Sequence, residues 1–267
     1  MYSRAVTAAP RISVLISTFN NARFVAKKLA EIQAQSIFHE AEFLFIETAS
    51  PERERELLRP FCETHSNCRL ITTDDRRTLY EAWNLGWTAA RAPLLCYSNM
   101  DDAMHPRLLE TVAAAMEKNS WDACSVLIGK QPENDPRLND WSAARFRRRG
   151  LCTRPGAFTA WRTALQDSVG RFDGRFIGAG DLDFWSRLVA HRVSVGLVPK
   201  ILYLYTKSPG QLSKSSDGRR AHDNALLAAK DYPITWHRGW GRRVRWWRWV
   251  VRLFPRCFCL PTASAAR

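Results

Sequence analysis

Two groups of acidic residues have the residue types and spacing that metal or acid–base chemistry uses. The first is Asn99-Met100-Asp101-Asp102, which directly follows the apolar segment APLLCYS (92–98). Oxygen ligands spaced this closely suit a hard divalent cation such as Mg²⁺ or Mn²⁺, and such a cation can in turn hold a diphosphate. A simpler interpretation is also open, in which the two aspartates cap the helix expected from Pro106 or lie solvated in a turn.

The second group is Asp181 and Asp183 in the segment GAGDLDFW. A carboxylate held at the start of a helix can act as a general base and remove the proton of an attacking hydroxyl. Asp183 lies two residues further on and cannot share the helix face of Asp181. The structural alternative makes Asp181 the N-cap of a helix over 182–191, with Asp183 in its favourable first turn. Arg187 is then a salt-bridge partner or part of the wall of the site.

The elements that must position these residues alternate along the chain. Apolar, β-rich segments are each followed by polar residues and then by a helical pattern, at 11–17, 43–47, 68–72 and 92–98. This alternation predicts a parallel, doubly wound sheet. Ligands bind beyond the carboxyl ends of such strands, so the polar ends Thr18 to Asn20, Glu47 to Ser50 and Asn99 to Asp102 should meet in one crevice.

Composition narrows the kind of partner. The 267 residues carry 40 Lys and Arg against 26 Asp and Glu, a formal charge of +14, which predicts attraction to phosphates, nucleic acid or an acidic membrane. The seven cysteines are scattered and lack metal-ligand spacing, as expected in a reduced cytosolic compartment. No apolar run is long enough to span a bilayer, so we expect a cytoplasmic protein whose membrane contact is peripheral.

Several segments resemble the family two glycosyltransferases, in order and over most of residues 11–213. STFNNARFV looks like the first-strand T-Y-N segment, IETASPE looks like D-[DN]-[GA]-S-x-D, and LYEAWNLGWTAARAPLLCYSNMDD looks like Y-D-A-x-N-x-G…L-[DN]-x-D-D. The stretch GRFDGRFIGAGDLDFWSRLVA resembles G-x-F-D-x-x-F…[ED]-D-x-D-[FL]-x-x-R-[LA]. Each piece is weak alone, but the shared order and spacing make the resemblance specific.

The resemblance implies a GT-A (Rossmann-like) fold, with a mixed, mainly parallel sheet flanked by helices, and an inverting hexosyltransferase-type enzyme. It implies a nucleotide-sugar donor, with UDP expected, and a glycan or lipid-linked acceptor in polysaccharide biosynthesis. The residues expected to bind the donor are Thr18, Phe19, Asn20, Glu47, Ser50, Arg77, Asn84, Asn99, Met100 and Asp101. Asp101 is expected to ligate the divalent cation, and Asp181 falls on the family's catalytic aspartate. Asp102, Asp183 and Arg187 are expected to contact the acceptor or support the site.

The sequence also departs from the family pattern. Asn99 replaces the more familiar first aspartate, and Ser208 stands where a histidine can join the metal. Gly180 occupies a position that is often acidic in the family. These departures reduce the number of expected metal ligands. They leave open a second hypothesis, in which the chain is a non-catalytic module that binds sugar nucleotides or glycans.

The C-terminal segment 235–260 is rich in tryptophan and arginine. On a helix, one side carries Trp236, Trp240, Val244, Trp247, Val251 and Phe254, and the other carries Arg238, Arg245, Arg248 and Arg252. Such an amphipathic helix suits an anionic membrane surface, here the inner face of the cell membrane. Binding of nucleic acid through this basic tail and packing against the domain are the alternatives, but no nucleic-acid module accompanies it, so we expect no nucleic-acid partner.

The predicted organisation follows from these assignments. Residues 1–10 form an N-terminal extension, and 11–216 form the glycosyltransferase domain. Within that domain, 11–102 make the nucleotide-binding half and 103–216 the acceptor half. Residues 217–267 form the basic, membrane-associating tail.

Overall fold

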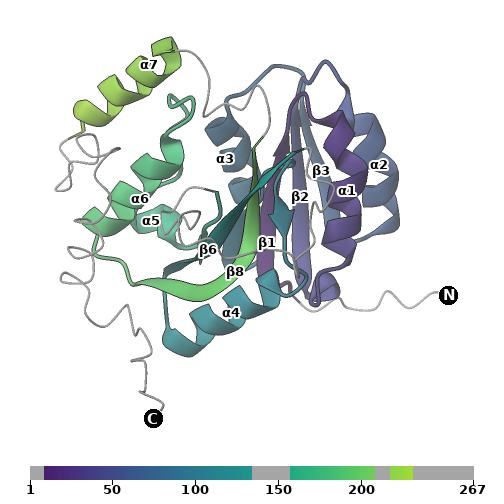
Figure 1. The fold of residues 1–267 in the computed structure, drawn as a ribbon, viewed down its shortest axis with the longest axis horizontal. Coiled ribbons are helices and arrows are strands. Elements are labelled where there is room, and N and C mark those ends of the chain that lie inside the picture. The colour runs from purple at the N-terminus through teal and green to yellow at the C-terminus, as the bar shows by residue number, and fades with distance from the viewer. Residues whose placement is uncertain (1–8, 134–156, 208–216, 231–267) are drawn as a thin grey trace.

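The computed structural model describes residues 9–133, 157–207 and 217–230, which form three layers with a sheet between helices (Figure 1). The helices are α1 Ala22–Gln33, α2 Glu54–Thr64, α3 Leu79–Ala89, α4 Leu108–Asn119, α5 Leu165–Ser168, α6 Gly180–Ala190 and α7 Asp217–Ala228, with a short 3₁₀ turn at Phe38–Glu40. The strands are β1 Ile12–Thr18, β2 Ala41–Thr48, β3 Cys68–Thr73, β4 Leu94–Tyr97, β5 Ala103–Met104, β6 Ala123–Pro132, β7 Ala160–Arg162 and β8 Val195–Lys207.

The strands make one mixed sheet in the order β3-β2-β1-β4-β7-β6-β8-β5. β1 pairs in parallel with β2 and with β4, and β2 pairs in parallel with β3, so these four strands end at the same edge. β7 runs antiparallel to β4 and β6, and β5 runs antiparallel to β8, whereas β6 and β8 are parallel. The predicted α/β fold is confirmed, including its four alternating N-terminal strands.

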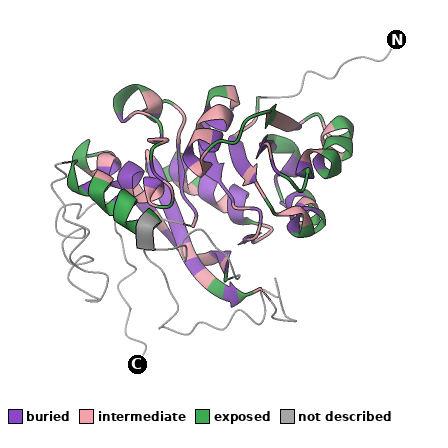
Figure 2. Cartoon of the chain, turned by 90° about the horizontal axis from the view of Figure 1, so that it is seen from above, coloured by how far each residue is buried: buried purple, intermediate pink, exposed green. Residues whose placement is uncertain are grey.

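Each face of the sheet buries its own hydrophobic core, because successive side chains of a strand point to opposite faces. Ile12, Val14 and Ile16 of β1 pack under α1, α2 and α4, while Leu15 packs under α3 and α6. Gly86 lets α3 lie close to the sheet, since a Cβ there would stand 2.8 Å from Leu15 Cδ2 and 2.9 Å from Ile46 Cδ1. Figure 2 shows the buried sheet inside and exposed outer faces on the helices.

The chain beyond the predicted domain end at 216 continues into α7, which packs on the same side of the sheet as α6. Leu227 of α7 is 5% exposed and joins the core cluster that contains Phe176 and Phe184. In the described part of the chain, no helix is long and apolar enough to cross a membrane. The tryptophan-rich segment 235–260, expected to be amphipathic, lies outside the described residues.

Candidate active site

The loops after β1 and β2 are joined by hydrogen bonds at the carboxyl edge of the sheet. Thr18 Oγ1 and the backbone N–H of Asn21 both donate to Glu54 Oε1, at 3.2 and 2.6 Å. The N–H of Asn20 donates to Ser50 Oγ at 3.0 Å, and Asn20 adopts a left-handed φ of 54°. The structure therefore brings Thr18, Asn20 and Ser50 together at the carboxyl ends of parallel strands.

Glu47 is fully buried at the end of β2, and both of its carboxylate oxygens have protein partners. Oε1 accepts the N–H of Ser50, and Oε2 accepts Nε of Arg55. Arg55 also donates to the carbonyl of Thr73, at 2.9 Å, and so links the ends of β2 and β3. Glu47 thus shapes this edge of the sheet by joining the loop after β2 to Arg55.

Phe19 presents a half-buried ring at the same edge. The guanidinium carbon of Arg76, from the loop after β3, lies 3.9 Å from the centre of this ring. A cation over an aromatic face is attracted by the ring quadrupole, so Arg76 and Phe19 form one flat, positively charged surface. The neighbouring Arg77 is exposed and pairs with Asp75 at 2.8 Å.

The acidic loop after β4 is built around the buried carboxylate of Asp102. Oδ2 accepts Nδ2 of Asn99 at 2.9 Å and the hydroxyl of Tyr203 at 2.9 Å, and Oδ1 accepts the N–H of Thr206 at 2.8 Å. Burial, followed by the neighbouring charge of Asp101, raises the pKa of Asp102 to about 8. Asp102 therefore supports the loop by tying it to β8.

A buried lysine lies beneath the same loop. Lys28 of α1 is 1% exposed, and its ammonium donates to Glu31 Oε1 at 3.0 Å, Ser98 Oγ at 3.1 Å and the carbonyl of Asp102 at 2.8 Å. The three partners belong to α1, to the end of β4 and to the acidic loop. Lys28 therefore fixes the loop to the helix layer.

The acidic loop carries oxygen atoms of the kind that coordinate a divalent cation. Asp101 is half-buried, Asn99 keeps its amide oxygen once its nitrogen has bonded Asp102, and Met100 is buried in the core. Mg²⁺ is commonly bound through one or two carboxylates together with substrate phosphates, so Asp101 and Asn99 fit a cation that arrives with a diphosphate. Among the described residues, no group of three or more His, Cys, Asp or Glu side chains gathers as a metal site. Ser208 lies outside the described residues.

Asp181 lies in the first turn of α6, where the predicted helix start requires a correction. The helix begins at Gly180 and its N-cap is Ala179, which has no side-chain oxygen, so Asp181 is not the N-cap. Its Oδ1 instead accepts the N–H of Leu182 at 2.8 Å, and the hydroxyl of Tyr80 hydrogen bonds its carboxylate. Burial outweighs these bonds and raises the pKa of Asp181 to about 7.

Gly180 makes room for Tyr80 beside this carboxylate. A Cβ at Gly180 would stand 2.7 to 2.8 Å from three carbons of the Tyr80 ring, and Tyr80 is only 2% exposed. The departure from the family pattern at Gly180 therefore has a steric reason. An acidic side chain at this position would displace the tyrosine that contacts Asp181.

We expect Gly180→Ala to destabilise the protein, although the same change usually stabilises a helix. Overpacking of a buried site costs about 1–3 kcal/mol, and the Tyr80 ring is held within the core cluster of α3 and α6. Thermal denaturation of the variant and the wild type would measure the change. A variant at least as stable as the wild type would show that the ring moves aside freely.

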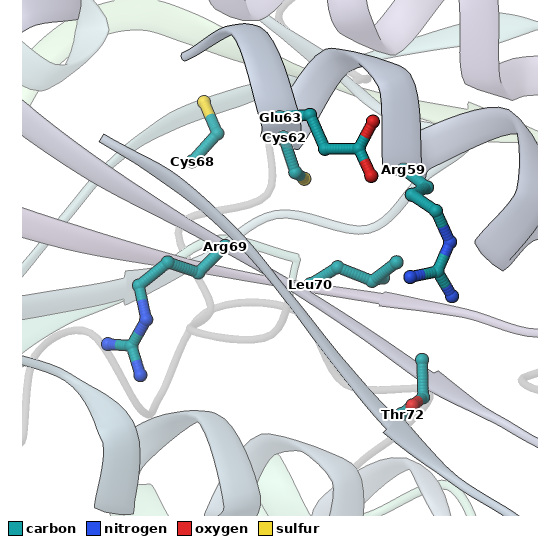
Figure 3. Close-up of a pocket in the computed structure, with 7 residues that line it drawn as sticks. All are labelled: Arg59, Cys62, Glu63, Cys68, Arg69, Leu70 and Thr72. Atoms are coloured by element: carbon teal, nitrogen blue, oxygen red, sulfur yellow. The ribbon is translucent and has the colours of Figure 1, made fainter. Parts of the chain in front are cut away.

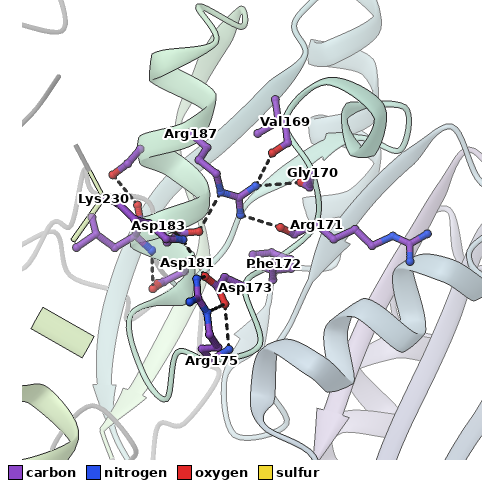
Figure 4. A network of polar contacts seen from close by, with 12 residues as sticks. Val169, Gly170, Arg171, Phe172, Asp173, Arg175, Asp181, Asp183, Arg187 and Lys230 are labelled. Atoms are coloured by element: carbon purple, nitrogen blue, oxygen red, sulfur yellow. Dashed lines mark hydrogen bonds and ion pairs between the residues drawn. The ribbon is translucent and has the colours of Figure 1, made fainter. Parts of the chain in front are cut away.

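The remaining predicted residues on this side of the sheet form a network around α6 (Figure 4). Asp183 is fully buried and accepts Nε of Arg187 at 2.9 Å. The same guanidinium donates to the carbonyls of Val169, Gly170 and Arg171 at 2.6, 3.1 and 2.8 Å. Arg187 is thus the salt-bridge partner that one of the two interpretations expected, and it anchors the loop before α6.

Asn84 belongs to this side of the sheet and not to the loops after β1 and β2. Its amide nitrogen donates to the carbonyl of Phe172 at 2.8 Å, and its oxygen accepts the N–H of Phe172 at 3.1 Å. Both ends of the Asn84 amide therefore bind the backbone of Phe172 and hold the loop before α6 against α3. The structure does not bring Asn84 together with Thr18, Phe19 and Glu47.

Tyr97, the last residue of β4, links the two acidic groups. Burial raises the pKa of Tyr97 well above its ordinary value, and the charges of Asp181 and of Asp102 both raise it further. Both carboxylates therefore lie near one buried phenol. The two groups that the sequence places 80 residues apart lie around the end of the same strand.

Three buried residues of the site were missed by sequence reasoning, namely Lys28, Glu54 and Tyr80. Lys28 had a signal, because it occupies an apolar position of α1, four residues from both Phe24 and Ile32. Tyr80 also had a signal, because it stands at the tyrosine of the Y-D-A-x-N-x-G pattern, whereas Glu54 had none. Their roles depend on partners that are distant in the chain.

A separate cavity of about 330 Å³ lies between α2 and the edge strand β3 (Figure 3). Its lining is made by Arg59, Cys62, Glu63, Cys68, Arg69, Leu70 and Thr72. None of these is a predicted site residue. The cavity is therefore distinct from the polar edge described above.

Comparison with known proteins defines the class. The structure resembles S. aureus TarS residues 1–349 in complex with UDP-GlcNAc, with a TM-score of 0.66 and 15% identity over 84% of this chain and 68% of that one. It resembles the longer S. aureus TarS chain with a TM-score of 0.59 and 17% identity, covering 82% of this chain but only 42% of TarS. The mannosyltransferase PcManGT from Pyrobaculum calidifontis, in complex with GDP-Man and Mn²⁺, gives a TM-score of 0.61 and 20% identity over 85% and 67%. The fold is that of the GT-A glycosyltransferases.

The family follows from the sequence itself. The sequence profile of "Glycosyl transferase family 2" matches residues 13–166, which is more than half of the 267 residues. A search of curated proteins finds no significant match. The chain belongs to glycosyl transferase family 2 and is a glycosyltransferase.

Proposed function

We propose that this enzyme transfers a sugar from a UDP-linked donor to a hydroxyl of a lipid-linked or polysaccharide acceptor, with inversion at the anomeric carbon. The observation that carries the proposal is the setting of Asp181. This carboxylate is held in the first turn of α6, hydrogen bonds the N–H of Leu182 and the hydroxyl of Tyr80, and has a pKa raised to about 7. A general base works best when its pKa lies near the working pH.

In the proposed reaction, Asp181 takes the proton of the acceptor hydroxyl as that oxygen bonds to the anomeric carbon. The bond from this carbon to the diphosphate breaks on the opposite side, and its electron pair leaves with the diphosphate. Asp181 then releases the proton to solvent. Asp101 and the amide oxygen of Asn99 would hold a divalent cation, Mn²⁺ or Mg²⁺, which neutralises charge on the leaving diphosphate when bound.

The loops after β1, β2 and β3 supply the proposed nucleotide site. Phe19 under Arg76 offers a flat surface for a base and a positive charge for phosphate. Thr18, Asn20 and Ser50 line the same edge, and Glu54 Oε2 is a buried acceptor without a partner among the described residues. Such an acceptor suits the imide N–H of uracil.

A donor screen would test this proposal. Thermal shift with UDP-GlcNAc, UDP-glucose and GDP-mannose, with and without Mn²⁺, should show stabilisation by one UDP-sugar that increases with the metal. NMR of the transfer product then reads the anomeric configuration. Stabilisation by GDP-mannose alone would overturn the UDP assignment, and a product of retained configuration would overturn inversion.

The proposed base predicts a pH dependence. Asp181 must be deprotonated to accept a proton, so kcat/KM should rise with pH through about 7 and fall roughly tenfold per unit below it. Rates measured from pH 5 to 9 with saturating Mn²⁺ would show this acidic limb. A rate independent of pH between 5.5 and 8 would exclude Asp181 as the base of a rate-limiting step.

We further propose peripheral association with the inner face of the cell membrane through residues 235–260. The support is the alternation of tryptophan and arginine in the sequence, which suits anionic headgroups. Sedimentation with vesicles of anionic phosphatidylglycerol should retain the full chain, while phosphatidylcholine vesicles should retain much less. Tighter binding to a single-stranded oligonucleotide than to the anionic vesicles would support the nucleic-acid alternative.

A further inference from the structure

α7 lies outside the residues that define the family, yet it contacts the segment that carries Asp181. The family profile ends at residue 166, and α7 covers Asp217–Ala228. Asp223 and Leu227 of α7, together with Lys230 after it, form the side that faces the domain. They are spaced as residues on one face of a helix are. The opposite side is exposed (Figure 2).

Asp223 holds the backbone of the loop just before α6. Its Oδ1 accepts the N–H of Ile177 at 2.9 Å, and its Oδ2 accepts the N–H of Gly178 at 2.8 Å. Asp223 is 6% exposed, so these are buried bonds to a carboxylate, which is the strong class of hydrogen bond. The two amides lie three and four residues before Asp181.

Lys230 holds the same region from the end of α7. Its ammonium contacts Asp183 Oδ1 at 2.5 Å and Asp173 Oδ2 at 2.9 Å, and it lies 5.0 Å from the centre of the Phe176 ring. Asp183 is the fully buried aspartate two residues after Asp181 (Figure 4). Its charge is therefore balanced by Arg187 within α6 and by Lys230 from outside it.

We propose that Asp223 and Lys230 are positioning residues for Asp181, holding the 173–178 loop and the first turn of α6 so that the carboxylate faces the acceptor. This proposal rests on the proposed function of Asp181 as base. Asp223 also acts on that carboxylate through its charge, which contributes to the raised pKa of Asp181. Both residues lie beyond the predicted end of the catalytic domain at 216.

The first test is hydrogen exchange of the full chain, which does not depend on catalysis. In Asp223→Asn, the amide nitrogen that replaces one oxygen cannot accept an N–H, so one of the two loop amides loses its partner. We expect exchange at Ile177 or Gly178 to become about 10- to 100-fold faster, as loss of a bond to a charged group predicts. Asp167→Asn, at an exposed carboxylate of α5, is the matched control.

The second test is kinetic and uses UDP-GlcNAc as the donor, or the UDP-sugar that the screen selects. Asp223→Asn should lower kcat about tenfold with KM for the donor unchanged, and should move the acidic limb to lower pH because a negative charge is lost. Lys230→Met should lower kcat similarly, Lys230→Arg should recover most of it, and Arg220→Met on the exposed face is the matched control.

The outcomes separate the two proposals. Suppose that loop exchange is faster in Asp223→Asn but that the wild-type protein turns over no donor. The result would then support the contact between Asp223 and the loop and refute the proposed function. Unchanged loop exchange in Asp223→Asn, or wild-type kcat in both Asp223→Asn and Lys230→Met, would overturn the positioning proposal. If Asp223→Asn does not fold, the Lys230→Met and Lys230→Arg pair decides the question with the same readouts.

Discussion

Asp181→Asn is expected to lower the rate of sugar transfer by about 10²- to 10⁴-fold, the usual contribution of a general base. Asparagine keeps the size of the side chain and an oxygen that can accept the N–H of Leu182, so the turn of α6 is preserved. Donor affinity should stay within about twofold, because the proposed nucleotide site lies in the loops after β1, β2 and β3. Product formation and UDP-sugar binding by calorimetry would measure the two quantities.

A stability measurement distinguishes this effect from misfolding. The pKa of Asp181 is raised in the folded protein from an ordinary 3.8 to about 7. The stability that this proton binding contributes is present below pH 3.8 and is lost as the pH rises through 7, when a buried carboxylate becomes charged. At pH 8 Asp181→Asn should therefore melt at or above the wild-type temperature. A variant that melts well below the wild type, or that transfers sugar at the wild-type rate, would contradict the assignment.

Lys28→Met is expected to cause a large loss of stability. Removal of one member of a buried ion pair costs about 3–5 kcal/mol, because the remaining charge is left uncompensated. Here Glu31 would lose its nearest cation, and Ser98 and the carbonyl of Asp102 would lose a donor. With about 2–4 °C per kcal/mol for a chain of this size, the melting temperature should fall on the order of 10 °C.

The control for this prediction is Lys118→Met, at an exposed lysine of α4, which should change the melting temperature little. The double variant Lys28→Met with Glu31→Gln should recover part of the loss, since it removes the orphaned charge as well. Equal melting temperatures for Lys28→Met and Lys118→Met would show that the buried ammonium contributes nothing to the acidic loop.

The position of the acidic loop was predictable from local pattern, because an apolar strand that ends in polar residues must leave the core there. β1, β2 and β4 are all apolar strands that end in polar residues. Their parallel pairing brings Thr18, Ser50 and Asn99 to one edge of the sheet. Asp181 was also predictable, but only through the resemblance of its segment to a family. Its helix start was placed wrongly, because α6 begins two residues before the expected 182, at Gly180, with Ala179 as an N-cap that has no side-chain cap.

The partners of each carboxylate were not predictable, since they are side chains brought close by folding. Nothing near Glu47 in the sequence shows that Arg55 takes one of its oxygens, although the two are eight residues apart. Asp101 and Asp102 are neighbours with opposite surroundings, one half-buried and one enclosed by Asn99, Tyr203 and Thr206. Thr206 lies on β8, more than 100 residues further along the chain. The packing of that distant strand therefore decides which of the two aspartates is enclosed.

By itself the sequence determined the α/β class, the alternation of strands and helices in the N-terminal half and the family, because hydrophobic periodicity and ordered motifs are local properties of the chain. Only the tertiary structure decided that Asn84 binds the loop before α6, that Gly180 leaves room for the Tyr80 ring, and that Lys28 lies beneath the acidic loop. It also decided that α7, beyond the predicted domain end, holds the loop before Asp181. The physical reason is that burial and ion pairing depend on which elements pack together, and that packing is set by the sheet as a whole.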